Sequence, residues 1–251
     1  MCDSISCTPK TIISTRRRFL RTTGGTAIAA ALAGVLPNRA AVAADDKASA
    51  PKPQNAVSPD DAIKRLMEGN ARYVAGVTRR HDFVHEREAL RGGQNPFAAV
   101  LGCADSRIAP EYAFDSARGD LFVTRVAGNF VNDDVLGSLE YAVAVLTIPA
   151  ILVLGHDQCG AVEAAVKVVT QGATYPGKIQ SLAESLVPAV DKVKHRDAPH
   201  LLDAAIVQNV RDSMAGLRAH SSIIRNASEA GTLKIVGGVY RLASGKVESV
   251  V

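Results

Sequence analysis

Two short segments of the chain carry side chains that commonly bind metal ions. Cys103 ends the apolar run "FAAVLGC", His156 follows the run "AILVLG", and Cys159 comes three residues after His156. Asp105 stands two residues after Cys103. Thiolate, imidazole and carboxylate are ligands that zinc accepts in tetrahedral geometry. Any one of these residues alone is commonly a packed or turn residue, but their joint placement after two similar apolar runs predicts a zinc site.

Arg107 bears on whether such a zinc site is structural or catalytic. A structural zinc keeps four protein ligands, whereas a catalytic zinc leaves one position for water. Arg107 lies two residues after Asp105 and can form a bidentate ion pair with its carboxylate. If it does, Asp105 is only a conditional fourth ligand, and we expect water to take its place at neutral pH. Zinc brings the pKa of a bound water from 15.7 to roughly 7 in favourable sites.

The surrounding elements must bring these loops together. The apolar runs predict buried strands over 97–103, 121–126, 150–155 and 233–239, and helical patterns cover about 58–75, 134–146, 160–171, 179–194 and 200–229. This alternation predicts an α/β fold with a mainly parallel central sheet flanked by helices. Ligands of such sheets gather outside the carboxyl ends of the strands. Cys103 and His156 both lie at such ends.

Four segments together resemble the β-class carbonic anhydrases. They are "CADSR" at 103–107, "RVAGN" at 125–129, "SLEYAV" at 138–143 and "GHDQCG" at 155–160, and the likeness covers about 58 to 241. The resemblance implies that fold, one zinc per subunit held by Cys103, His156 and Cys159, and Asp105 and Arg107 as a catalytic dyad. It also implies that a hydroxide attacks carbon dioxide to give bicarbonate and a proton.

The resemblance further implies a substrate pocket and an oligomer. Gln94 corresponds to a glutamine that donates a hydrogen bond to substrate in the plant-like subgroup. Phe122, Ala127 and Tyr141 fall where the family lines a small apolar pocket, often across a dimer interface, and Gly160 places backbone beside the substrate. Ala127 replaces a commoner valine. The chain has no Trp, whereas the subgroup with an inhibitory bicarbonate site carries one in place of the glutamine. We expect a homodimer or a dimer of dimers.

The first 43 residues have the pattern of an export signal. Thr15, Arg16, Arg17, Phe19 and Leu20 match the twin-arginine motif, a short apolar run follows, and "AVA" predicts cleavage between Ala43 and Ala44. Residues 44–57 are small, polar and proline-containing, which predicts a flexible tether before an enzyme domain at 58–251. We therefore expect a periplasmic protein without a stable membrane span after processing. Without the signal the chain has 23 basic and 24 acidic groups, so its charge gives no reason to expect a nucleic-acid partner.

Three alternatives remain open at this point. Enzymes of the same fold that hydrolyse carbonyl sulfide or carbon disulfide share the zinc motifs. A noncatalytic exported zinc-binding protein would close its site with Asp105 as a permanent ligand, although it would not need Arg107. A disulfide between Cys103 and Cys159 is also compatible with export, but it would leave His156 and the Asp105–Arg107 pair unexplained.

Overall fold

The computed structural model describes residues 56–250 of the 251-residue chain. The predicted signal at 1–43 and nearly all of the predicted tether at 44–57 lie outside the described residues, so the domain boundaries stay predictions. Within the described part, no helix is both long enough and apolar enough to cross a bilayer.

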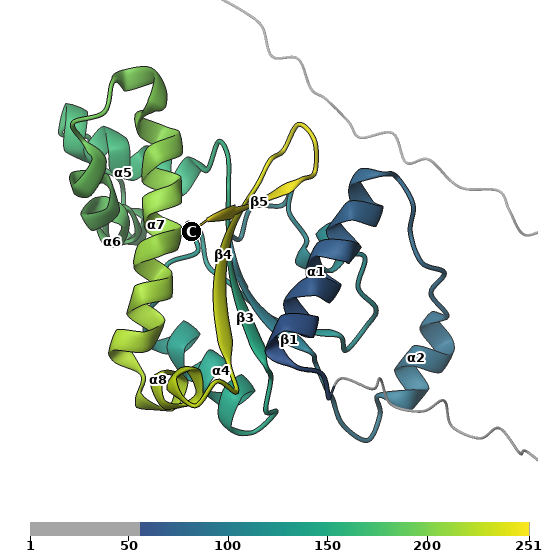
Figure 1. The fold of residues 1–251 in the computed structure, drawn as a ribbon. Helices are drawn as coiled ribbons and strands as arrows, with labels where there is room; N and C mark the ends of the chain where they lie inside the picture. Colours follow the sequence, from purple (N-terminus) through teal and green to yellow (C-terminus); the bar gives the residue numbers. More distant parts are fainter. Residues whose placement is uncertain (1–55, 251) are drawn as a thin grey trace, which may run out of the picture. The chain divides into compact units, whose positions relative to one another are not determined.

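The described residues form a sheet and a set of helices in the alternating order that the sequence predicts (Figure 1). The strands are β1 (Ala98–Gly102), β2 (Leu121–Arg125), β3 (Ala150–His156), β4 (Lys234–Tyr240) and β5 (Val247–Val250). The helices are α1 (Pro59–Val74), α2 (Phe83–Ala89), α3 (Pro110–Ala113), α4 (Asp133–Ala144), α5 (Gly160–Gln171), α6 (Lys178–Val193), α7 (Ala198–His220) and α8 (Ser222–Glu229).

The sheet has the order β2-β1-β3-β4-β5, and its first four strands are parallel. This confirms the predicted fold class. The last strand, β5, is antiparallel to β4 and was not predicted. It forms a hairpin with β4 through a turn at Gly245, whose φ of 72° is readily accessible only to glycine. Helices α2 and α3 were also missed, since both are shorter than two full turns of periodic pattern.

The strand order creates a crevice between β1 and β3. From β1 the chain crosses to β2 on one side, then returns past β1 to β3 on the other side. Loops that leave the carboxyl ends of two such strands diverge, which opens a space for a ligand at this switch point. Cys103 directly follows β1 and His156 ends β3. The topology therefore explains how residues more than fifty positions apart reach one place.

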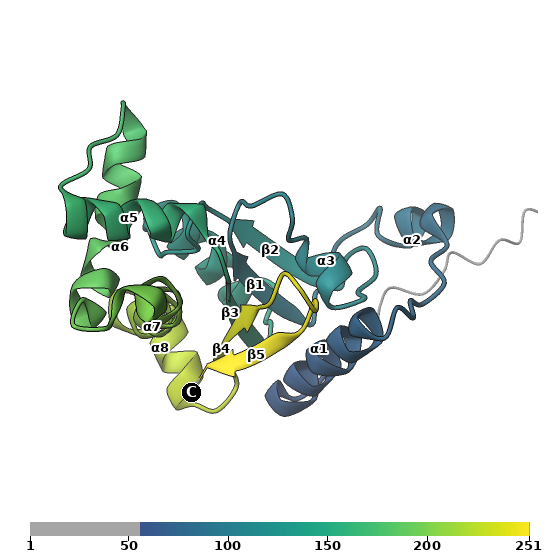
Figure 2. The same ribbon diagram turned by 90° about the horizontal axis from the view of Figure 1, so that it is seen from above.

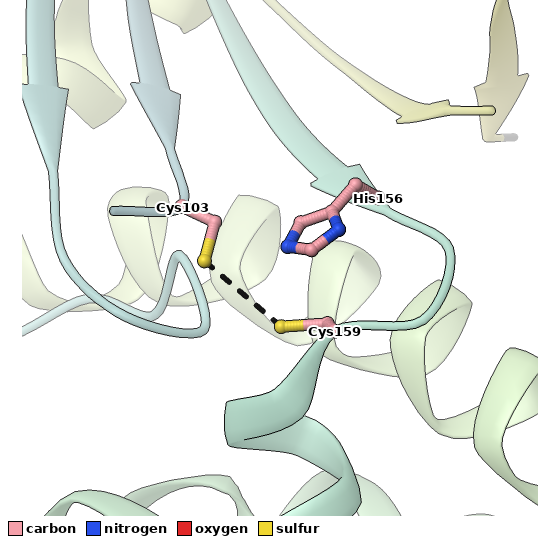
Figure 3. Close-up of side chains that lie close together, drawn as sticks. All are labelled: Cys103, His156 and Cys159. Carbon is pink, nitrogen blue, oxygen red and sulfur yellow. Dashed lines mark hydrogen bonds between the residues drawn. The ribbon is translucent and has the colours of Figure 1, made fainter. Parts of the chain in front are cut away.

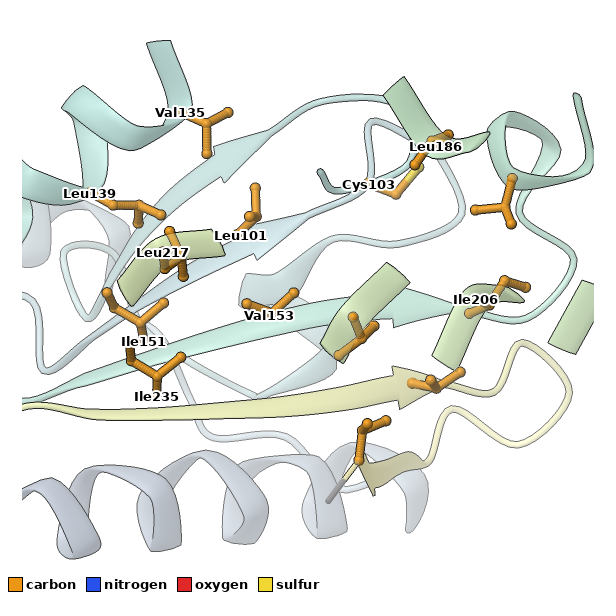
Figure 4. Close-up of a cluster of buried hydrophobic side chains, with 14 of the residues drawn as sticks. Leu101, Cys103, Val135, Leu139, Ile151, Val153, Leu186, Ile206, Leu217 and Ile235 are labelled. Atoms are coloured by element: carbon orange, nitrogen blue, oxygen red, sulfur yellow. The ribbon is translucent and has the colours of Figure 1, made fainter. Parts of the chain in front are cut away.

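Alternating side chains divide the apolar interior between the two faces of the sheet. Leu101 of β1 and Val153 of β3 belong to the larger core, which helices α4 to α8 cover. Val100 and Leu152 point to the other face, where α1 and α3 pack. Figures 1 and 2 show α5, α6 and α7 on one side of the sheet and α1 on the other. Cys103 keeps the alternation of Leu101 and so enters the larger core (Figure 4).

Helix α1 starts where the sequence predicts but buries only part of its predicted face. In the sequence, Ser58 and Asp61 resemble a capping box. Ser58 accepts a hydrogen bond from the backbone N–H of Asp61 at 3.1 Å, which confirms this cap.

The spacing of apolar residues predicts one face made of Ile63, Leu66, Met67, Asn70 and Val74. Leu66 and Asn70 are buried, but Met67 and Val74 are substantially exposed, so the prediction was wrong for these two. The amide of Asn70 forms hydrogen bonds with Ala113, Gly245 and Val247 and so ties α1 to α3 and to the β4–β5 hairpin.

The prediction of a single helix over 200–229 is wrong, because α7 ends before Ser221 and α8 begins after it. Ser221 has extended backbone angles and is buried, and its hydroxyl accepts a hydrogen bond from the N–H of Ile224 at 3.1 Å. The same hydroxyl donates to Glu140 of α4 at 2.6 Å. A serine that caps the second helix and bonds another element outweighs the continuous helical pattern.

We predict that Ser221→Ala destabilises the fold. The substitution removes the cap of α8 and leaves the Glu140 carboxylate without this donor. The free energy of unfolding should fall by about 1–2 kcal/mol, measured by urea denaturation.

Ser222→Ala is the matched control, because Ser222 is the exposed first residue of α8. It should change the unfolding free energy by less than about 0.5 kcal/mol. Equal stabilities of the two variants would show that the break at Ser221 does not depend on its side chain.

Candidate metal centre

Cys103 lies at the start of the loop that leaves β1. Its side chain is 4% exposed. The backbone N–H of Gly128, in the loop after β2, donates a hydrogen bond to the Cys103 sulfur at 3.3 Å. The backbone N–H of Ala104 donates to the carbonyl oxygen of Val126, and the N–H of Val126 donates to that of Gly102, which holds the two segments side by side. The first sulfur of the site therefore has a fixed position next to a backbone donor.

His156, the last residue of β3, is completely buried. Its Nδ1 lies 2.8 Å from the carbonyl oxygen of Asp157, and because a carbonyl only accepts, Nδ1 carries the hydrogen. Its Nε2 has no hydrogen-bond partner among the described residues. A buried ring nitrogen without such a partner, with the opposite nitrogen fixed by a carbonyl, is the arrangement of a metal-ligating histidine.

Cys159 reaches the same point through a tight turn after β3. Gln158 adopts a φ of 53°, which reverses the chain before the helix begins. Asp157 anchors this turn to the connection between β4 and β5, because its carboxylate accepts a hydrogen bond from the N–H of Leu242 at 2.8 Å. Cys159 is then the N-cap of α5 and is 1% exposed. The helix N-terminus favours negative charge on its sulfur.

The three side chains point toward one another (Figure 3). The ligand atoms of Cys103, His156 and Cys159 all lie within 4.8 Å of one another. The two sulfurs are 4.0 Å apart, and both cysteines are free. A disulfide would need a separation of about 2 Å. The disulfide alternative is therefore wrong for this structure.

The cluster favours one negative sulfur. A hydrogen bond from Cys159, supported by His156 and by the Gly128 N–H, lowers the pKa of Cys103 to about 4 although burial opposes this. The same hydrogen bond to Cys103, together with burial, raises the pKa of Cys159. Burial lowers the pKa of His156, but the nearby Cys103 sulfur and the Asp157 carbonyl outweigh it and the net pKa is raised. A divalent cation would replace these shared protons.

Asp105 stands beside the cluster and is held by Arg107. One carboxylate oxygen accepts from the Arg107 Nε at 2.9 Å and the other from a terminal nitrogen at 2.7 Å, so the pair is bidentate as the sequence predicts. These hydrogen bonds lower the pKa of Asp105 to about 2. Its Oδ2 lies 3.9 Å from Nε2 of His156. Asp105 is thus ionised and lies next to the ligand atoms, but both of its oxygens bind Arg107. Its conditional role as a fourth ligand stays a prediction.

Arg125, at the end of β2, is a site residue to which sequence reasoning gave no role. Its guanidinium donates to the carbonyl oxygens of Cys103 at 2.8 Å, Asp105 at 2.6 Å and Ile108 at 2.8 Å. One side chain therefore fixes the loop that carries both a ligand and the Asp105–Arg107 pair. The "RVAGN" segment drew attention to this position, but no spacing rule shows which carbonyl groups an arginine will reach.

The residues fit a zinc ion. Two thiols and an imidazole are the donors that zinc prefers, and the three donor atoms are buried and converge. The buried Nε2 of His156 lacks a hydrogen-bond donor among the described residues, and a metal would satisfy its lone pair. Asp105 would leave a fourth position open, because Arg107 engages both of its oxygens. Such a donor set suits a catalytic zinc better than a closed structural one.

The residues predicted to bind substrate fall into two groups. Ala127 precedes the Gly128 N–H that contacts Cys103, and Gly160 follows Cys159, so both lie at the cluster. Phe122 pairs in register with Ala99, near the start of β1, and its ring lies 6.4 Å from that of Tyr141.

Gln94 belongs with the second group. It precedes the start of β1, and the five residues of β1 alone span about 16 Å. Within a single chain, Gln94, Phe122 and Tyr141 therefore lie toward the amino-terminal ends of the strands. Cys103 lies at the carboxyl ends, so they are not next to it.

Sequence comparison places the chain among known enzymes. Residues 98–247 match the family model described as carbonic anhydrase. The chain is 43% identical over 190 residues to carbonic anhydrase 2 of Mycobacterium tuberculosis, a match that covers 75% of this chain and 91% of the relative. It is 41% identical over 192 residues to a carbonic anhydrase of Mycolicibacterium smegmatis, covering 76% and 93% of the two chains.

Solved structures agree with this family and with its class. The β-carbonic anhydrase CcaA superposes with a TM-score of 0.60 at 27% identity, over 74% of this chain and 94% of that one. A Coccomyxa β-carbonic anhydrase, solved with acetazolamide, gives 0.57 at 27% identity over 76% and 82%. From the matched family model, the related sequences and the shared fold around a cysteine–histidine–cysteine cluster, the chain belongs to the β-carbonic anhydrase family.

Proposed function

We propose that this chain catalyses the reversible hydration of carbon dioxide to bicarbonate and a proton at the Cys103–His156–Cys159 cluster. The observation that carries this proposal is the Asp105–Arg107 ion pair, which keeps a carboxylate beside three convergent metal ligands without adding a fourth. A closed structural site has no need of this pair.

Cys103, His156 and Cys159 would hold the zinc. A bound zinc lowers the pKa of a coordinated water toward neutrality and so supplies the nucleophile. The chain supplies the orientation. The Asp157 carbonyl fixes the His156 ring, the Gly128 N–H stabilises the Cys103 sulfur, and the start of α5 positions Cys159.

Asp105 is the residue that would handle the proton of the reacting water. Asp105 is ionised, and its Oδ2 lies beside the cluster, 3.9 Å from Nε2 of His156. From there it can accept a hydrogen bond from the water that reacts with carbon dioxide and direct a lone pair toward the carbon. Arg107 holds the carboxylate in that direction through two parallel hydrogen bonds.

The environment of the cluster suits a small neutral substrate. Ala127 and Gly160 add no polar side chain, and apart from its chain neighbours and its own helix backbone no heavy atom lies within 4 Å of the point that a Cβ on Gly160 would occupy. Carbon dioxide needs little recognition beyond apolar space next to a nucleophile. The relatives are named carbonic anhydrases, which favours carbon dioxide over carbonyl sulfide or carbon disulfide.

A second copy of the chain would complete the pocket. Gln94, Phe122 and Tyr141 lie too far along the sheet to reach Cys103 of their own chain. Tyr141 is 47% exposed, although it is a large aromatic residue packed on another aromatic ring. A dimer that sets these residues against the cluster of its partner would supply the substrate hydrogen bond and the apolar wall. Pairing of two dimers is compatible with this arrangement.

The same chain would act outside the cytoplasm. The twin-arginine motif and the cleavage pattern at Ala43–Ala44 support export to the periplasm in the folded state. Folded export suits a buried metal cluster, because zinc can bind to reduced cysteines before the chain crosses the membrane.

Replacing Arg107 with Ala should abolish most activity without releasing zinc. Asp105 loses its bidentate partner and becomes free to turn toward the metal. We expect kcat/KM for carbon dioxide hydration to fall by about 100-fold, measured by stopped flow, with zinc content unchanged by elemental analysis.

Arg196→Ala is the control for loss of an arginine, because Arg196 is exposed in the connection between α6 and α7. Its activity should equal that of the unmodified protein. An Arg107→Ala variant with full activity would contradict the dyad.

A mixed dimer tests whether Gln94 acts on its partner. Cys103→Ser should abolish zinc binding, and Gln94→Ala should weaken catalysis while zinc stays bound. When the two variants are co-expressed with different tags and the mixed dimer is isolated, one of its two sites combines an intact cluster with an intact glutamine. That dimer should recover about half of the normal activity.

Each variant dimer alone gives the baseline for this comparison. The mixed dimer has one intact cluster, whereas the Gln94→Ala dimer has two. If the activity of the mixed dimer does not exceed half that of the Gln94→Ala dimer, then Gln94 does not act across the interface.

Export predicts a defined N-terminus. In a bacterium with a twin-arginine transporter, the periplasmic protein should begin at Ala44, as read by N-terminal sequencing. Replacing Arg16 and Arg17 together with Lys should leave the protein in the cytoplasm. A periplasmic protein that retains Met1 would contradict cleavage, and export of the lysine variant would contradict the route.

A further inference from the structure

Helix α7 contacts the loop beneath the Cys103 sulfur through two buried polar side chains. The amide nitrogen of Asn209 donates to the carbonyl oxygen of Gly128 at 2.7 Å. One helical turn later, the hydroxyl of Ser213 donates to the carbonyl oxygen of Asn129 at 3.2 Å. Each side chain is only 4% exposed. Two polar groups at this spacing lie on one face of the helix and hold two consecutive carbonyl groups.

The held loop has a backbone that needs support. Gly128 and Asn129 have φ values of 85° and 42°. Residues other than glycine adopt such positive φ values only at a cost in free energy. A Cβ on Gly128 would lie 2.7 Å from a methyl group of Leu186, so the loop also has little room to shift. The hydrogen bonds from α7 therefore stabilise a conformation that the loop would not keep by itself.

This conformation directs one donor at a metal ligand. With Gly128 so placed, its N–H points to the Cys103 sulfur at 3.3 Å. A hydrogen bond to a thiolate stabilises its charge and fixes the direction of its lone pairs. Loss of the donor would leave a sulfur that is less well oriented.

Helix α7 also packs against β3, the strand that carries His156. A Cβ on Gly155, the residue before His156, would lie 2.8 Å from Val210 of α7. Asn209 directly precedes Val210. Two consecutive residues of α7 therefore contact the Gly128 loop and β3. One rigid helix thus relates the histidine side of the cluster to the Cys103 side.

We propose that Asn209, with Ser213 as its support, is a positioning residue of the zinc site that keeps the Gly128 N–H on the Cys103 sulfur. The proposal rests on the proposed zinc-dependent function. Neither residue touches substrate or metal. Their effect reaches the reaction through the loop and the sulfur.

The test compares Asn209→Leu with Gln208→Leu in the full-length holoenzyme. Leucine keeps the approximate volume of asparagine but cannot donate to Gly128. Gln208 is the neighbouring amide on α7, bonds Asp212 at 2.9 Å and has no hydrogen bond to the loop among the described contacts, which makes it the matched control. The readouts are zinc retention against a chelator and the near-ultraviolet sulfur-to-cobalt band of the cobalt-substituted protein.

We expect Asn209→Leu to hold zinc about ten-fold more weakly and to shift the sulfur-to-cobalt band. The pH at half-maximal carbon dioxide hydration should also rise, because a sulfur without its hydrogen bond donates more charge to the metal. Gln208→Leu should match the unmodified protein in all three. A folded Asn209→Leu protein with unchanged retention and an unchanged band would overturn the proposal.

Ser213→Ala keeps the test decisive if Asn209→Leu does not fold. It removes the weaker of the two hydrogen bonds and should shift the same readouts in the same direction by a smaller amount. An unchanged cobalt band in folded Ser213→Ala would then overturn the proposal. Failure of the unmodified protein to bind zinc would refute the proposed function itself, which separates that outcome from failure of the positioning role.

Discussion

The bidentate ion pair between Asp105 and Arg107 fixes the position of a carboxylate beside the buried cluster. Oδ2 of Asp105 lies 3.9 Å from Nε2 of His156, and a carboxylate that bound a metal there would close a four-ligand site without room for water. Arg107 offers the carboxylate a partner of matching shape, and Arg125 holds the backbone on which both residues sit. The rest of the site, including the order of the strands, serves to bring Cys103, His156 and Cys159 next to this pair.

The sheet and the metal ligands could be predicted from the sequence because their signals are local. Runs of apolar residues mark the parallel strands, and Cys103 and His156 follow two such runs directly. Parallel strands in one sheet end at one edge, so the convergence of these residues follows from general rules. The Asp105–Arg107 pair could be predicted for the same reason, since two residues of separation leave few other geometries.

The remainder of the structure depends on contacts between distant segments. Ser221 interrupts a continuous helical pattern because its hydroxyl finds Glu140, 81 positions away. Asn70 is buried in α1 because it bonds the β4–β5 hairpin, and Asn209 reaches Gly128 across the same number of positions as Ser221 does Glu140. Periodicity places Asn70 on the apolar face of its helix, but it identifies no partner for any of these polar residues. Their partners are defined only when the whole sheet is assembled.

The depth of the three ligands bears on how the protein handles its metal over time. Cys103, His156 and Cys159 together expose almost no surface. Arg125 holds the loop that carries Cys103, and α7 holds the neighbouring loop at Gly128. An ion held there cannot leave, nor another enter, until part of this packing opens. Exchange of metal should therefore be slow compared with catalysis, and a folded molecule would carry the ion it acquired during folding through the rest of its life.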